Sequence, residues 1–233
     1  MNHSQYSLPH NRKKLHLLIT AGPTREPIDA VRFISNYSTG ILGYTLAKEA
    51  KRKGYKVTLV SGPTCLRPPQ GVKFVRVNTA FEMYEAVSKI FPYCDGLIMT
   101  AAVCDFQPAK VFKGKIKKEK NKQLILKLKK TPDILYEMGK RKKEKILIGF
   151  SLEAKSLLEH ARKKLREKNL DLLIAQDLKK NPFGQSKVSP LFIYRNGIKK
   201  RVASCTKSKL AKIILNEINT LTFNKLSDKL SQK

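Results

Sequence analysis

LHLLITA, residues 15–21, is a short apolar run of the kind that forms a buried strand. Further strand-like runs follow at residues 56–60 (KVTLV), 72–77 (VKFVRV) and 96–103 (GLIMTAAV). Helical spacing appears at residues 41–53 and at residues 79–91, where Thr79 and Glu82 form a capping box. Strands that alternate with helices predict an α/β fold with a mostly parallel sheet and helices on both faces.

The alternation stops at residues 106–130 and then resumes. This stretch is basic and alternates polar with apolar residues in QLILKLKK, so we expect an inserted flap or hairpin arm there. After it we expect a helix at 132–142, a strand at 146–150, a helix at 155–168, a strand at 170–175, a hairpin around Asn196-Gly197 and a helix at 207–221. We therefore expect one domain over residues 14–222, between a disordered tail at 1–13 and a basic, frayed tail at 223–233.

The chain is strongly basic: its 233 residues hold 48 Lys and Arg against 18 Asp and Glu, a formal net charge of +30. Residues 110–168 alone carry 21 basic and 7 acidic residues, a net charge of +14. This balance makes polyanions the expected ligands. Nucleic-acid binding is the less favoured interpretation, because Trp is absent and no RNP, KH or zinc-finger pattern occurs. A solvated lysine-rich surface is the alternative, and a basic pocket for a phosphorylated small molecule fits both.

Cysteines and apolar runs bear on the location of the protein. The four cysteines make no CxxC pair, which is typical of reduced residues in the cytoplasm. No apolar run approaches the roughly 18 residues that span a bilayer, and the first residues hold no apolar segment of a secretory signal. We therefore expect a cytoplasmic protein without a membrane partner.

The first candidate ligand site follows the first strand, because ligands of such sheets bind beyond the carboxyl ends of strands. Ser38, Thr39 and Gly40 open the helix at 41–53, where hydroxyls and backbone N–H groups suit a phosphate. An ordinary helix cap is the alternative interpretation. The glycine fingerprints GxGxxG and GxxxxGK[ST] are absent, which disfavours an NAD(P)-dependent reductase and a Walker ATPase.

The second candidate site follows the strand at 96–103. The small residues of AAVCDF, at 101–106, allow close approach of a flat ligand, and Asp105 suits a hydroxyl or a metal, although close packing and a turn explain the same residues. Cys104 has no histidine near it in the sequence, so Cys–His catalysis is disfavoured. The run KIKK at 115–118 suits closure over phosphates, or is simply a solvated face.

Eight motifs occur in one order over Leu15 to Leu221: TAGPTREPID, VRFISNYSTG, VTLVSGP, AAVCDF, KIKK, TPDIL, GFSLE and NLDLLIAQD. This set closely resembles the phosphopantothenoylcysteine synthetase family, the ligases of coenzyme A biosynthesis, in its bacterial form. The resemblance implies a Rossmann-like fold, a homodimer, CTP as cosubstrate and Mg²⁺ (or Mn²⁺) as metal. In that family the carboxylate of 4′-phosphopantothenate attacks CTP to give an acyl-cytidylate and pyrophosphate, and the amine of L-cysteine then displaces CMP.

The resemblance also implies roles for individual residues. Asn36 matches the asparagine that handles the acyl-cytidylate, and Lys115 matches the lysine used in forming it. Matches to nucleotide-binding positions are Met99, Thr100, Ala101, Asp105, Lys115, Pro132, Asp133, Ile134, Leu135, Phe150, Lys164 and Lys168. Ser38, Thr39, Gly40 and Arg32 are the candidates for the substrate phosphate, with Arg25 beside them. The metal ligands are unknown.

The chain departs from the family pattern at three points. Many bacterial relatives carry a flavin-dependent decarboxylase before this region, whereas about 14 residues precede the first strand here. We therefore expect no flavin, and a separate phosphopantothenoylcysteine decarboxylase as a partner in the pathway. Cys104 and Gln176 stand where many relatives have Ala and Asn. ATP, used by eukaryotic relatives, is the alternative nucleotide.

Overall fold

The computed structural model describes residues 14–117, 123–153, 157–177 and 186–231, and residues 1–13 lie outside them. Within these residues the main sheet has eight strands in the order β13-β12-β10-β9-β6-β1-β4-β5. Their bounds are β1 His16–Ala21, β4 Lys56–Ser61, β5 Lys73–Arg76, β6 Gly96–Met99, β9 Ile146–Glu153, β10 Leu172–Asp177, β12 Leu191–Tyr194 and β13 Lys199–Arg201. Neighbours from β5 to β10 pair in parallel, whereas β12 and β13 add an antiparallel hairpin.

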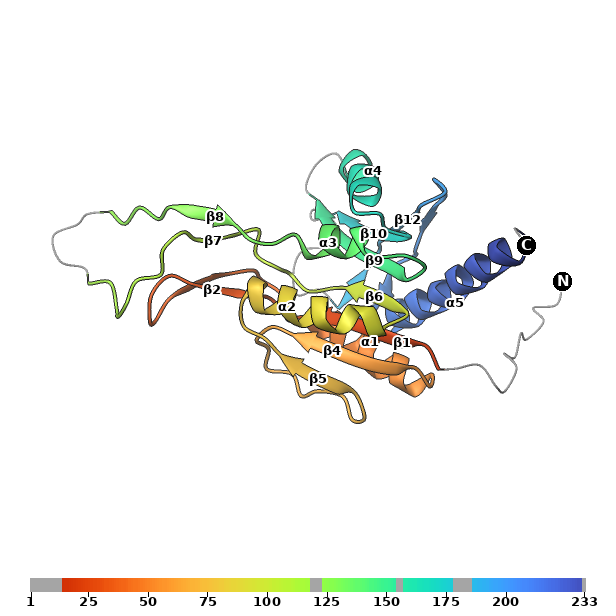
Figure 1. Ribbon diagram of the computed structural model, residues 1–233, viewed down its shortest axis with the longest axis horizontal. Helices are drawn as coiled ribbons and strands as arrows, with labels where there is room; N and C mark the ends of the chain where they lie inside the picture. The colour runs from red at the N-terminus through yellow and green to blue at the C-terminus, as the bar shows by residue number, and fades with distance from the viewer. Residues whose placement is uncertain (1–13, 118–122, 154–156, 178–185, 232–233) are drawn as a thin grey trace.

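Helices cover both faces of this sheet (Figure 1). On one face lie α1 (Ile41–Arg52) and α5 (Lys207–Ser231), and on the other lie α2 (Ala80–Ile90), the 3₁₀ helix η1 (Phe91–Tyr93), α3 (Ile134–Lys140) and α4 (Leu157–Glu167). Successive residues of β1 point to opposite faces, so Leu17 and Ile19 join one core and Leu18 the other. A sheet buried on both faces needs apolar strands throughout, and the predicted fold class is confirmed.

Local signals placed several element ends correctly. Thr79 caps α2, its Oγ1 accepting a hydrogen bond from the N–H of Glu82 at 3.2 Å. Gly197, with φ of 86°, turns the chain between β12 and β13 as the Asn-Gly pair predicts. The strand expected at 96–103 ends at Met99, because Ala102 leaves the sheet to pair with Pro23.

Two hairpin arms project from the sheet on the same side (Figure 1). One joins β7 (Phe106–Pro108) to β8 (Leu128–Lys130), which confirms the arm predicted at 106–130. The other joins β2 (Arg25–Pro27) to β3 (Phe33–Ser35), and no strand was expected there. The arms lie against each other through β2 and β7. A small separate pair joins β11 (Lys187–Val188) to β14 (Cys205–Thr206).

The last helix corrects one expectation. We expected it to end at Leu221 and a frayed tail to begin at 223, but α5 continues to Ser231. Its extension is anchored by Lys225, whose Nζ lies 3.0 Å from Asp171 Oδ1 and donates to the carbonyl of Lys145 at 3.0 Å. Phe223, Leu226 and Leu230 continue the apolar residues at helical spacing, but no local pattern signals the pairing of Lys225 with Asp171.

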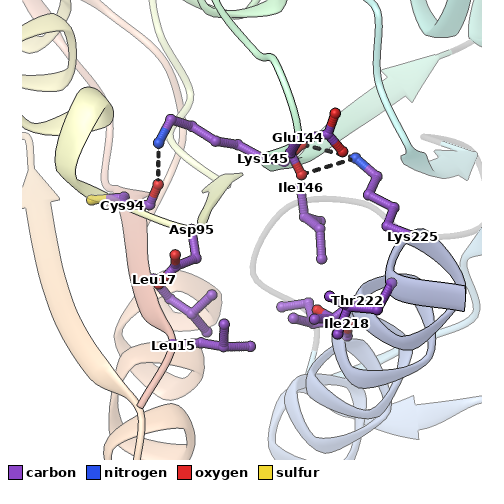
Figure 2. A pocket seen from close by; sticks show the side chains of 11 residues that line it. Leu15, Leu17, Cys94, Asp95, Glu144, Lys145, Ile146, Ile218, Thr222 and Lys225 are labelled. Atoms are coloured by element: carbon purple, nitrogen blue, oxygen red, sulfur yellow. Dashed lines mark hydrogen bonds between the residues drawn. The ribbon is translucent and has the colours of Figure 1, made fainter. Parts of the chain in front are cut away.

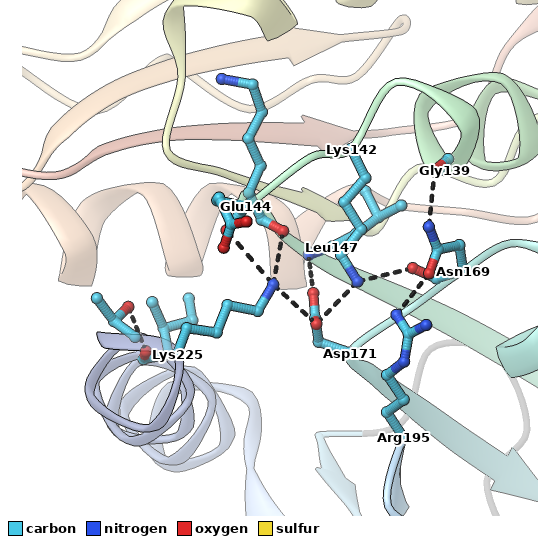
Figure 3. A network of polar contacts seen from close by, with 11 residues as sticks. Gly139, Lys142, Glu144, Leu147, Asn169, Asp171, Arg195 and Lys225 are labelled. Atoms are coloured by element: carbon cyan, nitrogen blue, oxygen red, sulfur yellow. Dashed lines mark hydrogen bonds and ion pairs between the residues drawn. The ribbon is translucent and has the colours of Figure 1, made fainter. Parts of the chain in front are cut away.

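Asp171 is the centre of a polar network at the amino edge of the sheet (Figure 3). Its Oδ1 also pairs with Nζ of the buried Lys142 at 2.8 Å, and its Oδ2 accepts from the N–H of Leu147 at 2.7 Å. Lys142 donates in addition to the carbonyl of Asn169 at 2.8 Å. Burial lowers the pKa of Lys142 to about 8, although the nearby carboxylate opposes that shift.

A cavity of about 240 Å³ lies at the same edge, between the first residues of β1 and β9 and the second half of α5 (Figure 2). Leu17, Ile146 and Ile218 form its apolar wall. Lys145 spans its rim and donates to the carbonyls of Pro92 and Cys94 at 2.9 and 2.5 Å. This edge is opposite to the carboxyl ends of the parallel strands, so the cavity is separate from the predicted site. Among the described helices, none is both long and apolar enough to cross a membrane.

Candidate active site

Two loops meet where the strand order changes direction, at the carboxyl ends of β1 and β6. The N–H of Ala102 donates to the carbonyl of Gly22 at 2.9 Å, and the N–H of Thr24 donates to the carbonyl of Ala102 at 3.3 Å. The N–H of Cys104 donates to Thr24 Oγ1 at 3.0 Å. The backbone that follows Met99 is therefore held in a fixed position beside the loop after β1.

Glycines allow this edge to close tightly. A Cβ added to Gly43 of α1 would lie 2.5 Å from Ala21 Cβ and 2.6 Å from Thr100 Oγ1. A Cβ added to Gly62 would lie 1.8 Å from the carbonyl oxygen of Pro23. Only glycine permits these approaches, which bring α1 against the ends of β1 and β6 and the loop after β4 against the loop after β1.

The predicted phosphate residues lie at the start of α1. Gly40 is the N-cap, with φ of 75°, and its N–H donates to Ser38 Oγ at 3.3 Å. Thr39 is exposed beside it. The Gly40 cap supplies no side-chain acceptor to the first N–H groups of α1, and this helix end lies beside the loop after β1, where a Cβ added to Gly40 would be 3.2 Å from the Gly22 nitrogen. The arrangement suits an anion at this helix end, as the sequence predicted.

Asn36 lies directly against the segment from Met99 to Asp105. Its Nδ2 donates to the carbonyl of Ala102 at 3.1 Å and lies 3.9 Å from Cys104 Sγ. The structure thus brings the candidate catalytic amide to the candidate nucleotide segment, although 66 residues separate Asn36 from Ala102. Burial raises the pKa of the Cys104 thiol, which disfavours the thiolate form that a nucleophile needs.

The start of α3 lies on the other side of this segment. Thr131 Oγ1 donates to the carbonyl of Cys104 at 2.5 Å, and the N–H of Thr131 donates to the carbonyl of Asp105 at 3.0 Å. Pro132 follows, and Asp133 caps α3 by accepting from the N–H of Tyr136 at 3.1 Å. Thr24 and Thr131 were not predicted as site residues, although the hydroxyls of both join these loops.

Basic residues in α4 and directly after it approach the same place. Lys168 Nζ lies 2.8 Å from Asp133 Oδ2, and Lys164 Nζ donates to Ser151 Oγ at 3.2 Å, near the end of β9. Ile134 is buried in the core, so its side chain is not available to a ligand, whereas Leu135 is half-buried. The structure therefore gathers the predicted positions of β6, α3 and α4 at one edge.

Phe150 lies apart from that group. Its ring packs with the core under α1 and α5, whereas Leu135 and the residues of α3 pack on the opposite face of the sheet. The alternation of β9 explains the difference, since Phe150 has the parity of Ile148. The Phe150 ring therefore approaches the carboxyl edge from one face of the sheet, whereas Lys164 and Lys168 approach it from the other face.

Lys115 is also not brought to Asn36. Lys115 is exposed, and its neighbour Ile116 is bound to the turn between β2 and β3 through Asp29 and Arg32. Asn36 stands at the inner end of the same arm. Four extended residues, from 32 to 36, span about 13 Å. Arg25 lies over the Phe33 ring at 4.5 Å, and Lys118 lies outside the described residues.

The described residues form neither a metal-binding cluster nor a cysteine-based catalytic site. Across the described ranges, no three His, Cys, Asp or Glu side chains converge as a metal cluster, and we assign no metal ligand among them. Cys94 Sγ lies 3.5 Å from His16 Nδ1 at the opposite edge. Burial raises the pKa of Cys94 to about 11 and lowers the pKa of His16, so both side chains remain neutral at physiological pH.

A doubly wound sheet with its candidate residues at the switch point defines the class: a Rossmann-like α/β ligand-binding domain. The first backbone N–H groups of α1, together with Lys164 and Lys168, suit phosphorylated ligands. The chain belongs to the family described as the DNA/pantothenate metabolism flavoprotein C-terminal domain, whose model matches residues 12–221. This match agrees with the family resemblance of the eight motifs, which is confirmed.

Individual relatives agree with this placement. The chain is 45% identical over 210 residues to the coenzyme A biosynthesis bifunctional protein CoaBC of Bacillus subtilis, covering 89% of this chain and 52% of the relative. It is 39% identical over 221 residues to the CoaBC of Escherichia coli K12, covering 93% and 54%. The chain thus spans about half the length of these relatives.

Solved structures show the same fold. The crystal structure of the C-terminal domain of CoaBC superposes with a TM-score of 0.78 at 38% identity, covering 90% of this chain and 96% of that one. A Cab2 mutant in complex with phosphopantothenate-cysteine superposes with a TM-score of 0.73 at 19% identity, covering 92% and 88%, and this likeness shows the fold alone.

Proposed function

We propose that this chain is a ligase that joins 4′-phosphopantothenate to L-cysteine in coenzyme A biosynthesis, giving 4′-phosphopantothenoylcysteine. The observation that supports it best is Asn36 held against Ala102 at the switch point, in a chain that belongs to this family. The motif asparagine and the motif nucleotide segment are distant in sequence, and an unrelated function would not require them to meet.

The proposed reaction has two steps and uses CTP. A carboxylate oxygen of 4′-phosphopantothenate bonds to the α-phosphorus, and the bond to the departing pyrophosphate breaks. The cysteine amine then attacks the acyl carbon of the acyl-cytidylate, loses a proton and expels CMP. No side-chain nucleophile is needed, which fits the burial that raises the pKa of Cys104. Orientation and electrostatic stabilisation carry the catalysis.

The residues divide by the groups they face. We propose that the Asn36 amide binds the acyl-cytidylate and that the Lys115 ammonium offsets charge on the phosphates during its formation. The nucleotide would lie along Met99–Asp105 and the start of α3, with Lys164 and Lys168 beside it. The start of α1 and Arg32 would hold the substrate phosphate. Mg²⁺ (or Mn²⁺), when bound, would neutralise phosphate charge.

The proposal includes a homodimer. Apolar side chains are exposed along both arms, at Val31, Phe33, Phe106, Ile125 and Leu128. Ile125 is 83% exposed. Several exposed apolar side chains on two neighbouring arms favour an interface, and we propose that a second copy covers them. The free cysteines fit a cytoplasmic enzyme, and a phosphopantothenoylcysteine decarboxylase would consume its product.

Pyrophosphate release tests the proposal. Purified protein with Mg²⁺, CTP and L-cysteine is assayed with and without 4′-phosphopantothenate, and with ATP in parallel. We expect release that depends on phosphopantothenate and favours CTP. Release that favours ATP would keep the ligase and overturn the nucleotide assignment. Folded protein that releases no pyrophosphate with either nucleotide would overturn the ligase.

A further inference from the structure

The backbone of Ile116 is held at both of its polar groups by one ion pair. Its N–H donates to Asp29 Oδ2 at 3.0 Å, and its carbonyl accepts from Arg32 Nη2 at 3.1 Å. Asp29 and Arg32 pair with each other through Oδ2 and Nη1 at 3.0 Å. The two side chains therefore act on Ile116 as a neighbouring strand would, although 87 residues separate Asp29 from Ile116.

Burial and further hydrogen bonds hold the Asp29 carboxylate in position for this contact. Its side chain is fully buried, and its other oxygen, Oδ1, accepts from the N–H groups of Val31 and Arg32, both at 2.8 Å. These bonds fix the carboxylate in the turn between β2 and β3. Hydrogen bonding, first of all from Ile116, holds the pKa of Asp29 below its usual range.

Apolar burial is slight in the described part of the β7–β8 arm beside Ile116. Every residue from Val111 to Lys117 is exposed except Ile116, which is half-buried. Two backbone hydrogen bonds also join the arm to the turn, from the N–H of Phe112 to the carbonyl of Ile28 at 2.9 Å and from the N–H of Ala30 to the carbonyl of Gly114 at 3.4 Å. Since apolar burial is slight, the polar contacts decide where Lys115 lies.

We infer that Asp29 and Arg32 are positioning residues for Lys115. The inference rests on the proposed function, because it needs Lys115 to act on the phosphates. Clamping Ile116 fixes the backbone beside Lys115 while the lysine side chain stays exposed. It also gives Arg32 a second role beside the one suggested by the motif, since Nη1 and Nη2 already have partners within the protein.

Hydrogen exchange tests the clamp without any catalysis. In Asp29→Ala the Ile116 amide loses a charge-assisted acceptor, and we expect it to exchange at least about tenfold faster. The Ala109 amide, which donates to Lys127 at 2.9 Å in the same arm, is the internal control and should keep its rate. Asp29→Asn keeps one acceptor oxygen and should give a smaller change. Unchanged Ile116 exchange in the folded variants would overturn the clamp.

A double-mutant cycle with Lys115→Gln tests positioning, with pyrophosphate release as the readout. If Asp29 acts through Lys115, Asp29→Ala lowers the rate at least about tenfold in the wild-type chain but not in the Lys115→Gln chain. The matched control Asp95→Asn changes an acceptor of the His16 N–H at the opposite edge and should have the same small effect in both backgrounds.

The outcomes separate this inference from the proposed function. Normal activity of Lys115→Gln would overturn the role proposed for the lysine and the positioning that depends on it. An impaired Lys115→Gln chain that Asp29→Ala impairs further by the same factor would overturn the positioning alone.

Discussion

Asp171→Asn should be among the most destabilising single changes in this chain. Asp171 is the shared partner of Lys142 and Lys225, and the side chains of Lys142 and Asp171 are only 2% and 5% exposed. An asparagine in its place can still accept from Leu147 N–H, but its amide N–H groups would then face two ammonium groups. Removing one partner of a buried pair costs about 3–5 kcal/mol, because the other charge stays buried.

Thermal unfolding measures this cost. For a domain of this size each kcal/mol lowers Tm by about 2–4 °C, so we expect a decrease of roughly 6–20 °C. The control is Glu137→Gln, which breaks an exposed pair with Lys140 at 3.0 Å and should cost about 0–1 kcal/mol. A decrease in Tm for Asp171→Asn that is no larger than that of the control would refute the reasoning.

The pH dependence of the loss provides a second check. The Lys142 pKa is about 8 in the folded protein and 10.5 as the ordinary value, so unfolding takes up a proton between these values and stability rises with pH there. Asp171 raises the pKa of Lys142 in the folded protein. Without Asp171 the Lys142 pKa falls below 8, so the rise in stability begins at lower pH. The stability difference between variant and wild type should therefore shrink as pH rises toward about 8. A difference that stays constant between about pH 6 and 8 would contradict this.

Three further changes test the site, the packing and the assembly. Asn36→Ala should lower the rate of pyrophosphate release at least about tenfold while Tm stays within about 2 °C, because Asn36 is exposed; a near-normal rate would remove its proposed role. Gly62→Ala places a Cβ 1.8 Å from a backbone oxygen and should cost at least about 1–3 kcal/mol in urea unfolding, more than Gly114→Ala, where only the positive φ opposes the methyl group; equal losses would contradict the close approach. Phe33→Asp should leave the fold intact and lower the mass seen by sedimentation from dimer to monomer, whereas an unchanged mass would place the interface elsewhere.

Prediction from the sequence succeeded where the signal was local. The apolar strands, the Thr79 cap and the Asn196-Gly197 turn each depend on neighbouring residues, and the structure confirms them. β2 and β3 escaped prediction because strands of three residues are too short to show a period of two. The face of the sheet on which Phe150 lies could be predicted, because residues two positions apart in a strand point to the same face and Ile148 is two positions earlier.

Long-range contacts set the limit for the candidate site. The motifs placed Asn36 and the segment after Met99 in one site, and the structure brings them together through the loop pairing. The separation of Asn36 from Lys115 depends on which turn Ile116 binds, and no periodicity encodes that choice. Likewise, the part of α5 beyond Leu221 is anchored by the pairing of Lys225 with a carboxylate 54 positions earlier in the chain.

Part of the positive charge lies on the two edge strands of the sheet, where it has a role unrelated to ligand binding. β13 ends the sheet on one side, and its residues Lys199, Lys200 and Arg201 are all exposed. β5 ends it on the other side with Lys73 and Arg76 exposed at its two ends. An edge strand offers unpaired backbone groups to any other strand, and like charges oppose that pairing. Copies of this protein therefore meet repulsion at the edges where sheets would otherwise merge, which favours solubility at high concentration.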